Sequence, residues 1–121
     1  MKTVLVVDDS LTDRRLLSTY LQTLGLTVLS AESAEEAMEK VNHHQPNLIV
    51  LDVIMGGKSG FEMCRKLKAD QKTKSIPVII CSSKSSEADK MLGKALGASG
   101  YVPKPVDQNE FLQQVRQILA V

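Results

Sequence analysis

Three carboxylates follow short apolar segments of this sequence. Asp8 and Asp9 come directly after the apolar residues 4–7, and Asp52 comes directly after the apolar residues 48–51. Carboxylates that are packed together repel one another, so one pKa must rise unless a cation lies among them. Because magnesium takes carboxylate, carbonyl and water oxygens as ligands, a divalent ion is the cation that these residues predict.

A hydroxyl and an ammonium follow two further candidate strands. Ser82 comes after residues 77–81, and Lys104 comes shortly after residues 100–102. Together with a divalent ion, these groups would surround a phosphoryl group with positive charge and a hydrogen-bond donor. A carboxylate can itself accept the phosphoryl group and become an aspartyl phosphate. Asp52 is the predicted acceptor because it stands alone at a central strand end.

Each of these residues taken alone has a simpler explanation. An aspartate after a strand is often a turn residue or a helix cap, and Asp9 or Ser10 would cap the first helix as Asp107 would cap the last. An acidic pair by itself is therefore weak evidence for a metal. The prediction depends on the four strand ends together, because ligands of open parallel sheets bind outside the carboxyl ends of the strands.

The apolar segments themselves are typical of strands in a parallel sheet. Residues 4–7, 48–51 and 77–81 are apolar at nearly every position, a pattern that indicates burial on both faces of the sheet. Residues 26–30 and 100–102 are weaker strand candidates.

Helical patterns alternate with the five candidate strands. The first helix begins near Ser10, and the second begins at residues 33–36 with the residue types of a capping box. In the fourth, the apolar spacing is carried by Ala88, Met91, Leu92 and Ala95. This order of strand and helix, repeated five times, predicts an α/β fold with a parallel sheet and helices on both faces.

Length predicts one domain over residues 1–121, and because the fifth helical pattern reaches the last residues we expect no second domain. Of the 121 residues, 43% are hydrophobic but only 3% are aromatic, so the core must be aliphatic. The net charge of +1 gives no electrostatic case for binding nucleic acid or a membrane surface. No segment reaches the length of a membrane span, and the start lacks a signal peptide, so we expect a cytoplasmic protein.

Five motifs resemble the receiver domains of bacterial response regulators. They are VLVVDDS at residues 4–10, LIVLDVIM at 48–55, Gly60, PVIICSSK at 77–84 and GASGYVPKP at 97–105. Each motif is weak alone, but all five in order and at receiver spacing are highly specific. The resemblance covers nearly the whole chain and implies a flavodoxin-like, doubly wound (βα)5 fold with strand order 2-1-3-4-5.

The resemblance also implies a role for each residue of the site. Asp52 would be the phosphoacceptor. Mg2+ would be bound directly by Asp9, Asp52 and the backbone carbonyl of Ile54, and through water by Asp8. Lys104 would contact the phosphoryl group.

Further residues would respond to the phosphoryl group. Ser82 would be the switch hydroxyl, Tyr101 would change rotamer with it, and the Lys104–Pro105 peptide bond would be cis. The surface of the fourth helix, fifth strand and fifth helix would then present the state to a downstream protein target. The phosphoryl donor would be a sensor histidine kinase or a phosphotransfer protein. The chain would be a monomer or a weak dimer.

Some positions depart from the family pattern. Residues 56–60 lack the proline that is common after the third strand, so we expect a looser loop there. Ser82 replaces the commoner threonine but keeps the hydroxyl. Pro103 falls in the fifth strand, which the implied order places at an edge, where proline is tolerated. Residues 87–94 resemble stand-alone receivers of pilus-driven twitching and phototaxis systems.

Four functions are compatible with these residues. The first is a phospho-switch that binds a partner, and the second is a phosphate shuttle within a phosphorelay. A small phosphohydrolase or nucleotide-binding α/β protein is the alternative from the enzyme class, but the sequence lacks GxxxxGK[ST] and GxGxxG. The last is a pseudo-receiver, a constitutive interaction module that binds no Mg2+. In the first reading the chain assists its own phosphorylation and is not a classical enzyme.

Overall fold

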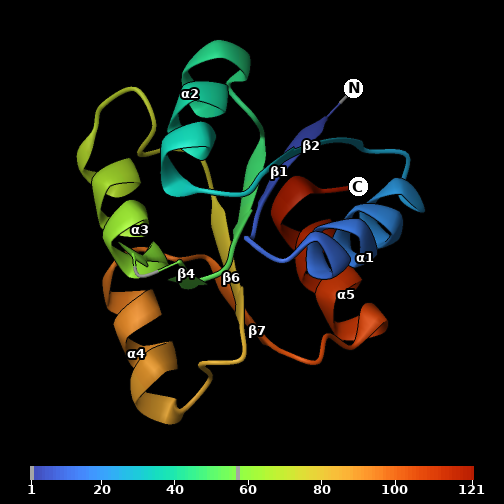
Figure 1. The fold of residues 1–121 in the computed structure, drawn as a ribbon. Coiled ribbons are helices and arrows are strands. Elements are labelled where there is room, and N and C mark those ends of the chain that lie inside the picture. Colours follow the sequence, from blue (N-terminus) through green and yellow to red (C-terminus); the bar gives the residue numbers. More distant parts are fainter. Residues whose placement is uncertain (1, 57) are drawn as a thin grey trace.

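A five-stranded parallel sheet with helices on both faces forms the protein in a computed structural model that describes residues 2–56 and 58–121 (Figure 1). The sheet consists of β1 (Thr3–Val7), β2 (Thr27–Ala31), β3 (Leu48–Leu51), β6 (Val78–Ser82) and β7 (Gly100–Pro103). The helices are α1 (Leu11–Gln22), α2 (Ala34–His44), α3 (Gly60–Ala69), α4 (Glu87–Ala95) and α5 (Gln108–Leu119). Strand and helix alternate along the chain, as the sequence predicts.

The strand order is β2-β1-β3-β6-β7, and every neighbouring pair is parallel. This is the predicted order 2-1-3-4-5, because a hairpin that the sequence did not predict adds two short strands to the numbering. The hairpin pairs β4 (Ile54–Met55) with β5 (Lys58–Ser59) in antiparallel fashion. It occupies part of the loop that we expected to be loose, and Gly57 of that loop lies outside the described residues.

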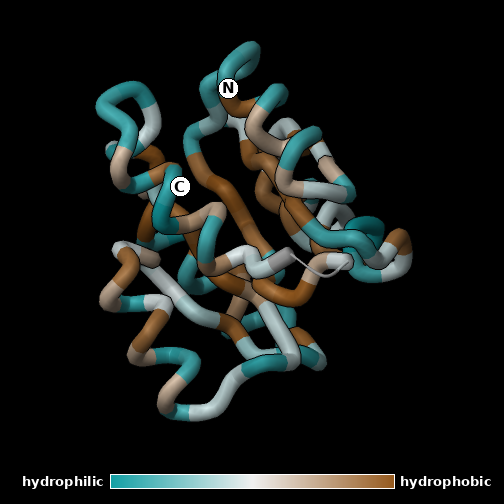
Figure 2. Tube along the Cα trace, turned by 60° about the vertical axis from the view of Figure 1, so that its left-hand side comes forward, coloured by the Kyte–Doolittle hydropathy of each residue, from teal (hydrophilic) through white to brown (hydrophobic). Residues whose placement is uncertain are grey.

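Two hydrophobic cores lie on opposite faces of the sheet. One packs against α2 and α3 and the other against α1 and α5, so alternate residues of β1 and β3 serve different cores. Figure 2 shows the apolar strands running inside a polar outer layer. Among the residues that the structure describes, Phe111 is the one aromatic in the set of the largest fully buried side chains. The aliphatic core predicted from composition is confirmed. Both cysteines are buried free thiols.

The helix caps are partly those predicted. Ser10 caps α1, and Asp107 caps α5. The Ser33 side chain caps α2 by accepting a hydrogen bond from the Glu36 amide. The Glu36 carboxylate, however, accepts from the Glu32 amide at 3.0 Å, so the predicted reciprocal capping box is wrong. A reciprocal box forms instead at the start of α4.

The predicted apolar face of α4 is not a core face. Met91 is 71% exposed and Leu92 is 45% exposed. Among the residues of α4, all of which are described, Gly93 is the one that is buried. A Cβ atom at Gly93 would lie 2.9 Å from the Ile80 side chain and 3.1 Å from the Tyr101 ring, so the helix approaches the sheet through its glycine. Within the described residues, no helix combines the length and the apolarity that crossing a bilayer requires.

Gly60 connects the hairpin to the strand end that carries Asp52. Its amide donates to the Val53 carbonyl at 2.9 Å, and α3 begins at this residue. A Cβ atom here would lie 2.3 Å from the backbone oxygen of Asp52 and 2.6 Å from the Cα atom of Val53. Because both atoms belong to the backbone, neither can move without displacing the end of β3.

We predict that Gly60→Ala lowers the free energy of unfolding by about 1–3 kcal/mol, because the added methyl group overpacks a backbone contact. Urea denaturation measures the change. Lys66→Ala, on an exposed position of the same helix, is the control and should change stability by less than about 0.5 kcal/mol. Equal stability of the two variants would contradict the close approach.

Candidate functional site

The predicted site residues lie at the carboxyl edge of the sheet. Val7 of β1 pairs with Leu51 of β3, so Asp8 and Asp52 occupy the next position on neighbouring strands. The Asp52 amide donates to the Val7 carbonyl at 2.9 Å and fixes this register. Strands β6 and β7 are joined past their ends in the same way, because the Lys104 amide donates to the Ser82 carbonyl at 3.0 Å.

The Lys104 ammonium binds three carboxylates at once. Its Nζ atom donates to Oδ2 of Asp8 at 2.7 Å, of Asp13 at 2.8 Å and of Asp52 at 2.9 Å. Only 15% of the Lys104 side chain is exposed, and those of Asp8 and Asp52 are almost fully buried. These are charge-assisted hydrogen bonds in a partly desolvated site, where they are stronger than on an open surface. The Lys104–Pro105 bond is cis, as the resemblance implied.

Asp8, Asp9 and Asp52 form a group that can hold a metal ion. Among the described residues, these three bring one carboxylate oxygen each to within 4.8 Å of one another. Oδ1 of Asp52 accepts from the Ile54 amide at 3.0 Å, and Oδ2 of Asp9 accepts from the Gly56 amide at 3.1 Å. All three candidate metal ligands are carboxylate oxygens, which suit Mg2+. Two of the residues are buried and one is exposed, which leaves room for water ligands. The predicted metal ligation by the Ile54 carbonyl stays a prediction.

Electrostatics at this edge favour an added cation. Burial raises the pKa of Asp8 above its ordinary value, although the hydrogen bond from Lys104 opposes the shift. Burial alone would lower the pKa of Lys104, but its hydrogen bonds to Asp13, Asp8 and Asp52 outweigh this and raise it. The lysine therefore stays charged at neutral pH, while the buried carboxylates are incompletely neutralised by it.

The two predicted switch residues meet at the backbone of Lys84. Ser82 is fully buried, and its Oγ atom accepts from the Lys84 amide at 3.1 Å. The Tyr101 hydroxyl donates to the Lys84 carbonyl. Both side chains thus bind one peptide segment just after β6. Their movement on phosphorylation stays a prediction.

Neither Ile54 nor Lys84 carries an amide or a carboxylate that could orient a water molecule for hydrolysis. Ile54 follows Asp52 by two residues and is 49% exposed. Lys84 follows Ser82 by two residues, and its ammonium lies 3.6 Å from Asp89 of α4. An isoleucine side chain has no donor or acceptor with which to orient a water molecule.

Asp13 also belongs to the site, although it is not among the residues predicted from the sequence. It lies in the first turn of α1, and its amide donates to Oγ of Ser10 at 3.3 Å. Asp8 and Ser10 are also linked, because the Ser10 amide donates to Oδ1 of Asp8 at 2.9 Å. The available signal was the short distance along the chain: α1 starts three residues after Asp8, so its first turn must lie at the same edge.

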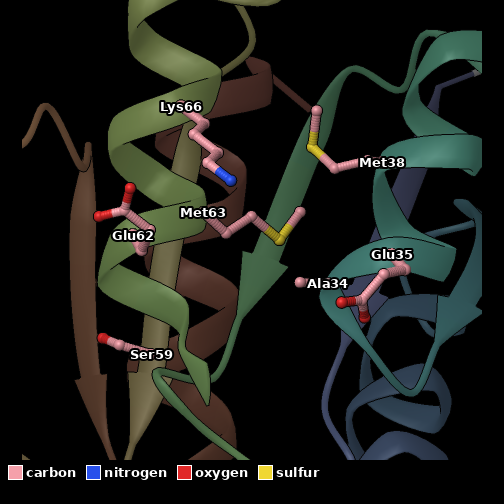
Figure 3. Close-up of a pocket in the computed structure, with 7 residues that line it drawn as sticks. All are labelled: Ala34, Glu35, Met38, Ser59, Glu62, Met63 and Lys66. Atoms are coloured by element: carbon pink, nitrogen blue, oxygen red, sulfur yellow. The ribbon is translucent and has the colours of Figure 1, made fainter.

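A separate groove of about 530 Å3 lies between α2 and α3. Figure 3 shows Met38 and Met63 reaching toward each other from the two helices, with Glu35, Glu62 and Lys66 around them. None of the carboxylates that bind Lys104 lines this groove. The predicted chemistry therefore belongs to the sheet edge and not to the groove.

A parallel sheet of this order, with a metal-competent group of three carboxylates and a lysine beside it at the carboxyl edge, defines a receiver-type protein. The family model of the response regulator receiver domain matches residues 4–116. The chain belongs to this family.

Similar proteins support the assignment along the whole chain. Protein PilH of Pseudomonas aeruginosa is 38% identical over 120 residues, which are 99% of both chains. The phosphate regulon transcriptional regulatory protein PhoB of the same organism is 35% identical over 118 residues, which are 98% of this chain and 52% of that protein.

Solved structures agree with the fold. A putative response regulator from Chloroflexus aurantiacus has a TM-score of 0.93 at 30% identity and covers 99% of this chain and 98% of its own. The chemotaxis protein CheY4 of Vibrio cholerae has a TM-score of 0.90 at 31% identity, with 98% of each chain covered. The flavodoxin-like receiver fold is thereby confirmed.

We predict that Asp8→Asn stabilises the protein at pH 7 without metal, by about 1 kcal/mol, the usual size of a single-site effect. The folded state binds the Asp8 proton more tightly than the unfolded state does, because burial raises the pKa of Asp8. Stability therefore falls as the pH rises from the ordinary aspartate value through the raised one, and the amide avoids this loss.

Urea denaturation in chelator at pH 7 and at pH 3.5 tests this prediction. The gain should shrink at the lower pH, where Asp8 of the unchanged protein is mostly protonated in both states. Asp70→Asn makes the same chemical change at an exposed position and is the control. A loss of stability at pH 7 would contradict the account.

Proposed function

We propose that this receiver domain is a phospho-switch that accepts a phosphoryl group on Asp52. The observation that carries the proposal is the triple contact of Lys104, which places an ammonium 2.9 Å from Asp52 beside a metal-competent carboxylate group. An Oδ atom of Asp52 attacks phosphorus, the bond from phosphorus to the donor breaks, and the donor group leaves with the electron pair. Lys104 neutralises charge on the transferred oxygens.

Mg2+ is the proposed cofactor of this transfer. Asp9, Asp52 and the Ile54 carbonyl would bind it directly, and Asp8 would bind it through water. When bound, the ion supplies positive charge to phosphoryl oxygens. The chain therefore assists its own phosphorylation and slow dephosphorylation and is not a classical enzyme.

Readout is proposed to pass through the shared Lys84 backbone to the surface of α4, β7 and α5. Ser82 binds that segment from β6 and Tyr101 binds it from β7. A Ser82 hydroxyl that turns to the phosphoryl group gives up its contact with the Lys84 amide, and Tyr101 loses a fixed partner. The exposed apolar side chains of Met91 and Leu92 on α4 then form part of the surface for a protein target.

The proposed donor is a sensor histidine kinase or a phosphotransfer protein. The resemblance of residues 87–94 to receivers of pilus-driven systems, and the end-to-end similarity to Protein PilH, support a place in motility control. A phosphate shuttle within a relay is the alternative, and it differs by passing the group on to a second histidine.

Acetyl phosphate with Mg2+ tests the acceptor. We expect one phosphoryl group per chain by intact-protein mass spectrometry, and none in Asp52→Asn or in excess chelator. Asp70→Asn makes the same chemical change at an exposed site and should be labelled as the unchanged protein is. Labelling that persists in Asp52→Asn would remove the assignment.

Other outcomes of this experiment separate the alternatives. A protein that binds no Mg2+ and takes no label would be a pseudo-receiver. Steady turnover of an external phosphoester would indicate a phosphohydrolase. Rapid transfer from the labelled chain to a histidine phosphotransfer domain would indicate a shuttle.

We predict that Ile54→Asn speeds loss of the phosphoryl group, because an amide can orient water where isoleucine cannot. The expected increase is roughly tenfold, which is less than the roughly hundredfold or more of a positioned general acid or base, because an amide only orients the water. The rate follows from the decay of the labelled mass after the donor is removed. Ile54→Leu keeps an apolar side chain and is the control. Equal decay in both variants would refute the role of position 54.

A further inference from the structure

Asp13 holds the Lys104 ammonium from outside the metal-competent group. Its Oδ2 atom lies 2.8 Å from Nζ, as close as those of Asp8 and Asp52. Asp8 and Asp52 also belong to the group that can hold a metal, and Asp13 does not. Of the three acceptors, Asp13 is therefore the one whose contact with Lys104 does not overlap with metal binding.

The overlap matters because the Lys104 ammonium has a limited number of hydrogens to donate. An ammonium has three hydrogens, and here three carboxylates accept one each. A cation that enters the group must share the carboxylates of Asp8 and Asp52 with Lys104. If Asp13 were neutral, the ammonium would concentrate on those same two carboxylates and would compete more strongly with the cation.

The position of Asp13 in the first turn of α1 holds its carboxylate near Lys104. The hydrogen bond from its amide to Ser10 anchors it in the first turn. Asp13 and Lys104 also line a small hollow of about 130 Å3, whose other walls are apolar: Leu16, Leu17, Pro105 and Val106. Apolar walls limit the approach of water on one side of the pair and reduce its screening, although the Asp13 side chain is 36% exposed.

We propose that Asp13 is a positioning residue for Lys104, an inference that rests on the proposed phosphoryl acceptance at Asp52. In the resting state it draws the ammonium away from Asp8 and Asp52, which favours binding of the cation. In the phosphorylated state it competes with the phosphoryl oxygens for the same ammonium, which disfavours that state. Asp13 thus favours the binding of the cation and disfavours the binding of the phosphoryl group.

Asp13→Asn tests this proposal, because the amide keeps the shape and removes the charge. Mg2+ binding measured by calorimetry without phosphodonor should be about threefold weaker, the size expected of a partly exposed charge. Binding of beryllofluoride, a phosphoryl mimic, at saturating Mg2+ should be about threefold tighter for the same reason. Asp13→Glu keeps the charge and should lie nearer to the unchanged protein in both measurements.

Glu110→Gln is the matched control. Glu110 is the third residue of α5 as Asp13 is the third residue of α1, both helices have 12 residues, and Glu110 is exposed. It should change neither affinity. If Asp13 has a purely structural role, Asp13→Asn should weaken the binding of both ligands and lower the thermal midpoint. That result would overturn the proposal.

Failure of this inference is distinguishable from failure of the proposed function. An unchanged protein that binds neither Mg2+ nor beryllofluoride would contradict phosphoryl acceptance itself. If the unchanged protein binds both and Asp13→Asn behaves as Glu110→Gln does, the positioning role alone is wrong.

Discussion

The binding of one ammonium by three carboxylates is the constraint on which the rest of the structure depends. Asp8 and Asp52 are buried, and buried carboxylates without a partner would be strongly destabilising. Lys104 reaches them because β7 ends at the same edge of the sheet as β1 and β3, and α1 adds Asp13 from its first turn. The fold thus supplies a site that is stable enough to exist and still holds more negative than positive charge.

The parallel sheet explains why such different residues meet. Its strands all deliver their carboxyl ends to one edge, so residues 8, 52, 82 and 104 converge although up to 96 positions separate them. Gly60 allows a helix to begin at this edge. Because it has no side chain, α3 can start directly against the backbone of Asp52. Local chain geometry and long-range pairing therefore converge on the same carboxylate.

Much of this arrangement could be predicted from the sequence, because apolar strands have short-range signatures and their ends are easily read. The order of the sheet, the cis bond at Pro105 and the convergence of Asp8, Asp9, Asp52 and Lys104 needed the family resemblance or the strand-end rule. The exposure of Met91 could not be predicted, since helical spacing says which residues share a face but not whether that face is covered. Asp13 was missed because a carboxylate in a first helical turn already has a sufficient local explanation.

The contacts of Ser82 and Tyr101 with residue 84 have a consequence for how the sequence can vary. Both involve main-chain atoms, the amide in one case and the carbonyl in the other. The link between the two strands is therefore indifferent to which side chain residue 84 carries. Residue 84 can therefore change its size and charge without loss of the two main-chain contacts that join β6 to β7 at this point.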